Sequence, residues 1–254
     1  MMLFHRAGAV LWITCWKNGF WRGLAGLEPG VGRGEMDEKL RLGVLLSGSG
    51  TTLQNIIDRS ATGELPAEVA VVVSSREDAY GLVRARNAGI PGFTVSTRRY
   101  RDVDERSRAV TGILDRYEPD LVVFAGYMHL YRVPLHFEGR IMNIHPALIP
   151  AFCGKGLYGH FVHEAVVASG VRVTGCTVHF VDNEYDNGPI ILQRVVAVRQ
   201  DDTPETLAER VQAEEREAYP EAIRLFAEDR LVIEKGRVRV LPGAWQPTSL
   251  CGTA

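Results

Sequence analysis

Several features that define other protein classes are missing from this sequence. Its four cysteines (Cys15, Cys153, Cys176 and Cys251) form neither a C-x-x-C pair nor a zinc-ligand spacing, which favours free thiols in a reducing cytoplasm. No segment approaches the roughly 20 consecutive apolar residues that a membrane-spanning helix needs. The net charge of −2 provides no basic surface for nucleic acid or anionic lipid. We therefore expect a cytoplasmic protein with no membrane, nucleic-acid or metal partner.

Common catalytic motifs are absent as well. The sequence contains no nucleophilic serine elbow and no H-E-x-x-H zinc motif. Its glycine-rich turn lacks both the Walker lysine and the G-x-G-x-x-G fingerprint. The chain does have 254 residues, 46% of them apolar and 24% charged, which is enough for one full core. We expect residues 38–245 to form one domain and residues 246–254 to form a C-terminal tail.

Residues 1–37 are predicted to be an N-terminal extension. This segment is rich in glycine and tryptophan, and the first strand-like segment begins only at Leu42. The apolar run that starts at Ala7 is similar to a signal peptide, but Trp16-Lys17 interrupts it. We favour a mis-assigned start with Met36 as the initiator over a disordered extension or a cleaved signal.

From Leu42 onward, short apolar segments alternate with helical ones. This alternation predicts an α/β fold with a doubly wound, mostly parallel sheet. Too little chain separates the strands predicted at 177–181 and 190–198 for a crossover, so we expect them to form an antiparallel hairpin. A long helix should follow, with Thr203 as its N-cap and Pro204 at its first position. The strands predicted before the hairpin are 42–46, 69–73, 92–95, 121–125 and 141–145, and the strands predicted after the long helix are 231–234 and 237–241.

Three polar residues stand out as candidates for catalysis. Asn143 and His145 lie at the carboxyl end of a predicted strand, where ligands bind in open α/β sheets. Because they are two residues apart, both side chains should point to one face. Asp186, in the turn that follows, offers the carboxylate that such a histidine needs as a partner. The alternative is that all three are structural: Asn143 caps a loop, His145 lies in the core and Asp186 forms a turn. This explains each residue alone, but not the three together.

The octapeptide N-I-H-P-A-L-I-P at residues 143–150 resembles the N-I-H-P-S-L-L-P signature of folate-dependent formyltransferases. Within this family the sequence is most similar to the phosphoribosylglycinamide formyltransferases, over residues 42–242. Each matching segment alone is weak evidence of relationship. Their order and spacing together identify the sequence as a member of this family, which implies the family's Rossmann-like fold. The other matching segments are S-G-S-G-T-T-L-Q (47–54), T-V-H-F-V (177–181), D-N-G-P-I-I-L-Q (186–193) and R-V-Q-A-E-E (210–215).

The resemblance implies transfer of the formyl group of 10-formyltetrahydrofolate, a co-substrate, to the amine of glycinamide ribonucleotide in de novo purine (IMP) biosynthesis. Both substrates are small molecules, and the protein would be a monomer or a homodimer. Asn143 and a protonated His145 would stabilise the oxyanion of a tetrahedral intermediate. Asp186 would pair with the imidazolium and relay the proton. This chemistry requires neither a metal nor a covalent intermediate.

The first glycine-rich turn is the expected phosphate site. It joins a strand to a helix, so its backbone N–H groups and the helix N-terminus can hold an anion. By resemblance, Gly50, Thr51 and Thr52 match the positions that bind the phosphate of the ribonucleotide. Thr52 stands where the family usually has asparagine, and both side chains can donate a hydrogen bond. A plain tight turn is the alternative.

The long C-terminal helix should provide the second contact to the nucleotide. Gln212, Ala213, Glu214 and Glu215 match family residues at this site. Glu215 is the strongest candidate, because its carboxylate can accept hydrogen bonds from ribose hydroxyls or from the primary amine. The alternative is a solvated, charged helix face.

The folate site departs most from the family pattern. His129 stands where the family has arginine, and the segment from there to Asn143 is shorter than usual. Arg101 is our choice for the arginine that meets the folate tail, with Arg98 and Arg99 as neighbours that could replace it. The residues that the resemblance assigns to folate are Arg101, Met128, His129, Leu130, Tyr131, Asn143, Asp182, Asn183, Glu184, Tyr185 and Asp186.

Three other functions can be weighed against this one. A formyltetrahydrofolate deformylase would use the same three residues with water as the nucleophile, but it normally carries a larger amino-terminal domain. A tRNA or sugar formyltransferase would need a further domain after Pro242. A non-catalytic folate or nucleotide binding module would keep the glycine-rich turn without any need for Asn143, His145 and Asp186 together.

Overall fold

The computed structural model describes residues 39–243, so our interpretations of residues 1–37 and of the tail at 246–254 fall outside the described part. Within it, a seven-stranded sheet has the order β3-β2-β1-β4-β5-β6-β7. The pairs from β3 to β5 are parallel, whereas β6 and β7 are added antiparallel. The strands of this sheet are β1 (Leu40–Leu46), β2 (Ala67–Ser74), β3 (Gly92–Thr94), β4 (Leu121–Phe124), β5 (Ile141–His145), β6 (Val173–Phe180) and β7 (Ile190–Ala197).

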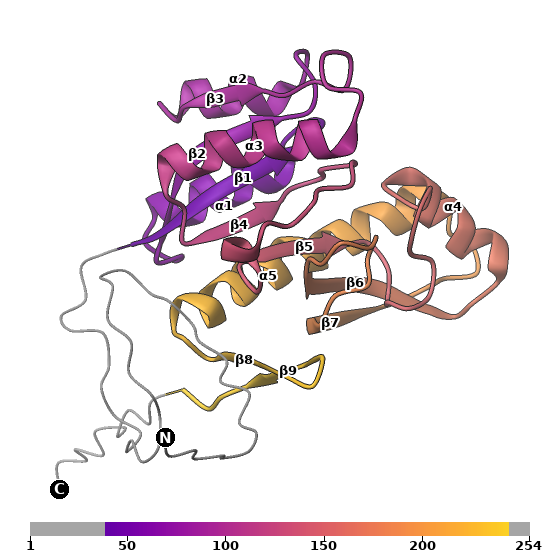
Figure 1. Ribbon diagram of the computed structural model, residues 1–254. Coiled ribbons are helices and arrows are strands. Elements are labelled where there is room, and N and C mark those ends of the chain that lie inside the picture. Colours follow the sequence, from indigo (N-terminus) through magenta and orange to yellow (C-terminus); the bar gives the residue numbers. More distant parts are fainter. Residues whose placement is uncertain (1–38, 244–254) are drawn as a thin grey trace, which may run out of the picture. The chain divides into compact units, whose positions relative to one another are not determined.

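Helices cover both faces of the sheet, as Figure 1 shows with α3 in front of it and α1 and α5 behind. The pleat of β1 explains this arrangement. Leu42 and Val44 pack with side chains of α1 and α5, whereas Leu45 points the other way and packs with α3. The predicted doubly wound fold with an antiparallel extension is confirmed. The helices are α1 (Thr51–Ala61), α2 (Tyr80–Asn87), α3 (Val103–Tyr117), α4 (His160–Ser169) and α5 (Pro204–Ala227), with a short 3-10 turn at Leu135–Phe137.

The C-terminal elements agree closely with the sequence patterns. Thr203 caps α5 by accepting a hydrogen bond from the Thr206 backbone, and Pro204 occupies the first turn. After α5, the strands β8 (Leu231–Glu234) and β9 (Arg237–Val240) form the small antiparallel hairpin that was predicted.

Two elements differ from the sequence prediction. Helix α4 was not predicted, and its N-cap, Gly159, has no side chain that could signal a helix start. Strand β6 begins at Val173, earlier than predicted. The prediction missed its first residues because Gly175 weakens the strand pattern in the sequence. Glycine is needed at that position, since a Cβ atom there would lie 1.9 Å from the Arg194 carbonyl oxygen.

Helix α5 contains a proline that α1 compensates. Pro220 has no N–H group, so the Arg216 carbonyl, four residues earlier, loses its helical donor. The Asn55 side chain of α1 replaces it, with Nδ2 donating to Arg216 O at 2.9 Å. This bond joins the two helices that carry the predicted nucleotide contacts.

We expect Asn55→Ala to lower the free energy of unfolding by about 0.5–1.5 kcal/mol, because it removes the only side-chain donor to that carbonyl within residues 39–243. Urea denaturation of four proteins gives the test: wild type, Asn55→Ala, Pro220→Ala and the double variant. With alanine at 220 the helix supplies its own N–H, so Asn55→Ala should then cost much less. An equal loss in both backgrounds would show that Asn55 does not replace the missing donor.

Candidate active site

The three predicted catalytic residues meet at the carboxyl end of β5. Asn143 Nδ2 lies 3.4 Å from Asp186 Oδ1, and His145 Nδ1 lies 3.5 Å from Asp186 Oδ2. Asn143 and His145 reach the same spot because they alternate with Ile144 along the strand. Asp186 returns to them from the turn between β6 and β7.

His145 is almost fully enclosed, with 3% of its surface exposed. Its Nε2 atom lies 2.9 Å from the Phe152 carbonyl oxygen, while Nδ1 faces Asp186. Both ring nitrogens therefore face acceptors, an arrangement in which only the imidazolium can donate on both sides. Phe152 and Asp186 both have a φ of 51°, a left-handed conformation that is uncommon for non-glycine residues.

His179 is a residue of this site that the sequence analysis did not single out. Strand register places it directly opposite Asn143. Burial lowers the pKa of His179, and its Nδ1 donates to Phe180 O at 2.8 Å. Its Nε2 can then accept from Asn143 Nδ2, 3.1 Å away, which fixes the Asn143 amide with its nitrogen toward Asp186. The alternation of residues in T-V-H-F-V could have drawn attention to His179. Only the pairing of β5 with β6 shows that its partner is Asn143.

A cavity of about 50 Å³ adjoins these residues. Most of the predicted folate contacts line it, namely His129, Leu130, Tyr131, Asn143, Asp182, Glu184, Tyr185 and Asp186. Arg101, Met128 and Asn183 were predicted too but do not line it. The lining residues that the sequence analysis did not include are Phe124, Tyr127, His179 and Val181.

The glycine-rich turn has the geometry of an anion site. Gly50 is the N-cap of α1 with a φ of 70°, and no side chain caps the helix. A Cβ atom at Gly50 would lie 2.6 Å from the Gly81 Cα, so only glycine fits. The backbone N–H groups of Thr51 and Thr52 begin the helix without a side-chain acceptor, as anion binding at a helix N-terminus requires.

The predicted nucleotide contacts on α5 fall into two groups. Gln212 and Ala213 are exposed, whereas Glu214 and Glu215 are partly enclosed. Glu214 accepts a hydrogen bond from Arg194 at 3.3 Å. Burial raises the pKa of Glu215 to about 7, so this carboxylate is held in a poorly solvated environment that a polar ligand could improve.

Glu215 should make stability depend on pH. Its folded pKa of about 7 exceeds the ordinary 4.5, so between these values the folded state binds a proton that the unfolded chain does not. Stability should therefore fall as pH rises through this window, by on the order of 1–3 kcal/mol in total. We expect Glu215→Gln to raise Tm at about pH 8 and to leave it nearly unchanged at about pH 4. A scanning-calorimetry difference that is the same at both pH values would contradict this assignment.

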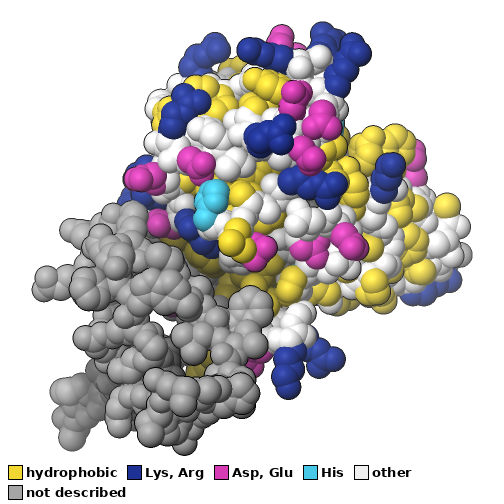
Figure 2. Space-filling model, viewed as in Figure 1, with side chains coloured by type: hydrophobic (Ala, Val, Ile, Leu, Met, Phe, Trp, Pro, Cys, Tyr) yellow, Lys and Arg dark blue, Asp and Glu magenta, His cyan; other side chains and the backbone are white. Residues whose placement is uncertain are grey.

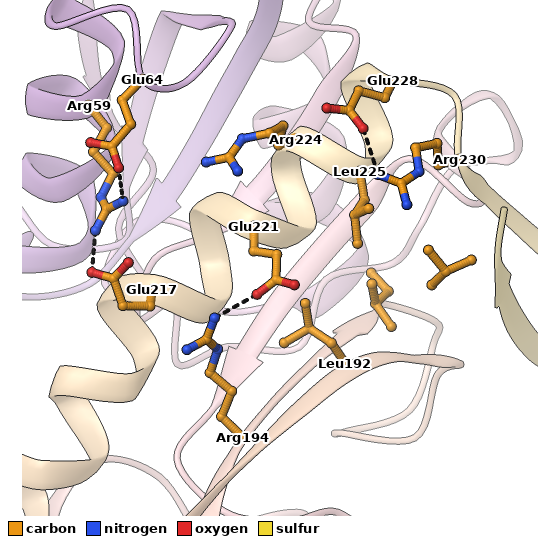
Figure 3. Close-up of a pocket in the computed structure, with 12 residues that line it drawn as sticks. Arg59, Glu64, Leu192, Arg194, Glu217, Glu221, Arg224, Leu225, Glu228 and Arg230 are labelled. Carbon is orange, nitrogen blue, oxygen red and sulfur yellow. Dashed lines mark hydrogen bonds and ion pairs between the residues drawn. The ribbon is translucent and has the colours of Figure 1, made fainter. Parts of the chain in front are cut away.

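A second cavity is larger, about 560 Å³, but contains none of the predicted site residues. It lies beside α5, and Figure 3 shows ion pairs along its wall. Arg59 bridges Glu64 and Glu217, and Arg194 contacts Glu221 at 2.7 Å. These charges largely neutralise one another, so the larger cavity offers few free groups for catalysis. The smaller cavity adjoins the three candidate catalytic residues and is therefore the better candidate for the active site.

Residues 39–243 contain neither a metal-binding cluster nor a membrane-spanning helix. In that range no group of three or more His, Cys, Asp or Glu side chains is placed to hold a metal ion. No helix there is long and apolar enough to cross a membrane. On the face drawn in Figure 2, basic and acidic side chains are interspersed, without a continuous basic stripe for nucleic acid.

Comparison with known proteins decides the family. A family profile described as formyl transferase matches residues 40–223. The chain belongs to the formyl transferase family. The family assignment that was made from the order and spacing of the matching segments is therefore confirmed.

Individual formyltransferases are similar over most of the chain. The crystal structure of glycinamide ribonucleotide transformylase 1 from Symbiobacterium toebii has 49% identity and a TM-score of 0.74, over 80% of this chain and 95% of that one. Phosphoribosylglycinamide formyltransferase from Haemophilus influenzae is 37% identical over 82% of this chain and 97% of that protein. A formyltetrahydrofolate deformylase from Pseudomonas syringae has 26% identity and a TM-score of 0.70, and this chain covers 67% of it. The predicted enzyme type, phosphoribosylglycinamide formyltransferase, is confirmed.

Proposed function

We propose that this formyltransferase moves the formyl group of 10-formyltetrahydrofolate to the amine of glycinamide ribonucleotide, in the cytoplasm and without a metal ion. The observation that carries the proposal is the enclosed cluster of Asn143, His145 and Asp186, with separations of 3.4 and 3.5 Å. The reacting end of the folate would bind against the residues that line the adjoining cavity, and the nucleotide would bridge the start of α1 and the middle of α5. The product would serve de novo purine biosynthesis, and the enzyme would act as a monomer or homodimer.

The reaction begins when the amine of the nucleotide attacks the formyl carbon. The carbonyl oxygen becomes an oxyanion, which Asn143 and the His145 imidazolium stabilise, each donor contributing about 3 kcal/mol. Both donors face Asp186 at 3.4–3.5 Å, longer than an ordinary hydrogen bond, so an oxyanion can take either hydrogen. Asp186 pairs with the imidazolium and accepts the amine proton, directly or through water. That proton then passes to N10 as the C–N bond to folate breaks.

A deformylase reaction uses the same three residues with water as the nucleophile. The test is to incubate the protein with 10-formyltetrahydrofolate, with and without glycinamide ribonucleotide, and to identify the products by mass spectrometry. We expect formylated nucleotide and tetrahydrofolate only when both substrates are present. Formate release without the nucleotide would indicate a deformylase, and binding without turnover would indicate a non-catalytic module.

A further inference from the structure

Arg106, in the first turns of α3, is a buried cation with no ion-pair partner among residues 39–243. Only 5% of its surface is exposed, and its Nε atom has no hydrogen-bond partner. Its two other nitrogens face backbone carbonyls: Nη1 donates to Tyr100 O at 3.2 Å, and Nη2 approaches Leu130 O at 3.5 Å. The Tyr127 side chain is a further polar neighbour of the guanidinium. A buried charge that lacks a counter-ion destabilises the folded state, so a purely structural role does not explain Arg106.

The two carbonyls belong to the loops assigned to folate. Tyr100 immediately precedes Arg101, the predicted contact to the folate tail, and Leu130 lines the cavity beside Asn143. Burial, and secondly the charge of Arg106, lower the pKa of His129, which also lines the cavity.

Other side chains of α3 hold the same wall of the cavity. Ser107 Oγ accepts a hydrogen bond from Arg132 N at 2.9 Å, and Thr111 Oγ1 lies 2.6 Å from the Tyr131 hydroxyl. Leu130, Tyr131 and Arg132 therefore each contact a side chain of α3. Arg106 differs from Ser107 and Thr111 in two respects: it is charged, and it also reaches the loop that carries Arg101.

We propose that Arg106 is a positioning residue for the folate substrate, because it holds the loop of Leu130 and the loop that carries Arg101 on α3. The inference rests on the proposed function. Because the nucleotide contacts lie on α1 and α5, which Arg106 does not touch, its loss should act on one substrate only.

Steady-state kinetics of Arg106→Met test the proposal, since methionine keeps an apolar stem and removes the charge and the donors. We expect the KM for 10-formyltetrahydrofolate to rise at least about tenfold, the loss typical of a charged hydrogen bond, with the KM for the nucleotide unchanged within about twofold. The matched control is Arg108→Met, an exposed arginine on the same helix, which should change neither constant. Equal rises for both substrates, or a folate KM like that of the control, would overturn the proposal.

Arg106→Lys keeps the test decisive if Arg106→Met does not fold. Lysine retains the charge but cannot reach both carbonyls, so the folate KM should rise at least about threefold with no change for the nucleotide. An unchanged folate KM, or equal rises for both substrates, would then overturn the role. If the wild-type protein fails to transfer the formyl group, the proposed function fails, and calorimetric affinities for 10-formyltetrahydrofolate still decide the role of Arg106.

Discussion

Asp186→Asn is expected to lower kcat by on the order of a hundredfold or more, and His145→Ala should do the same. Asparagine preserves the shape of Asp186 but removes the negative charge that faces His145 Nδ1 at 3.5 Å. The imidazolium then lacks its charge partner when the oxyanion forms, and one oxyanion donor is typically worth about 10²–10³ in rate. Stopped-assay kinetics at saturating concentrations of both substrates measure the loss.

The double variant separates a coupled pair from two independent residues. If Asp186 acts through His145, the double variant should be little slower than the slower single variant, because groups that act as a unit are not additive. Substrate affinities measured by calorimetry should stay within a few-fold, which shows that the site remains folded. Multiplicative losses would refute the coupling, and near-normal turnover in His145→Ala would refute this active-site assignment altogether.

Glu215→Ala should impair the use of the nucleotide while leaving the use of folate nearly intact. The KM for glycinamide ribonucleotide is expected to rise roughly tenfold to a hundredfold, the loss of one charged hydrogen bond. The reason is the position of Glu215, a poorly solvated carboxylate on α5, next to Glu214 and away from the cavity assigned to folate.

Glu209→Ala is the matched control, because Glu209 is an exposed carboxylate on the same helix. It should change neither KM. If Glu215→Ala raises the KM of both substrates equally, this part of α5 supports the fold instead of contacting the nucleotide.

The sequence alone determined the features that depend on neighbouring residues. Asn143 and His145 share a strand face because side chains alternate along any strand, whatever surrounds it. Thr203 and Pro204 begin α5 because their side chain and ring act on the adjacent turn. The order of short strands and helices likewise predicted the doubly wound sheet, since each segment carries its own periodicity.

Only the tertiary structure decided the partners that are distant in sequence. His179 meets Asn143 through the register of β5 with β6, and Asn55 meets Arg216 through the packing of α1 on α5. The sequence pattern gives no sign that Arg106 differs from the other charged residues of an amphipathic helix. The fold nevertheless encloses it between two loops. Such contacts depend on how whole elements pack, and no local pattern encodes that packing because many registers and orientations satisfy the same periodicity.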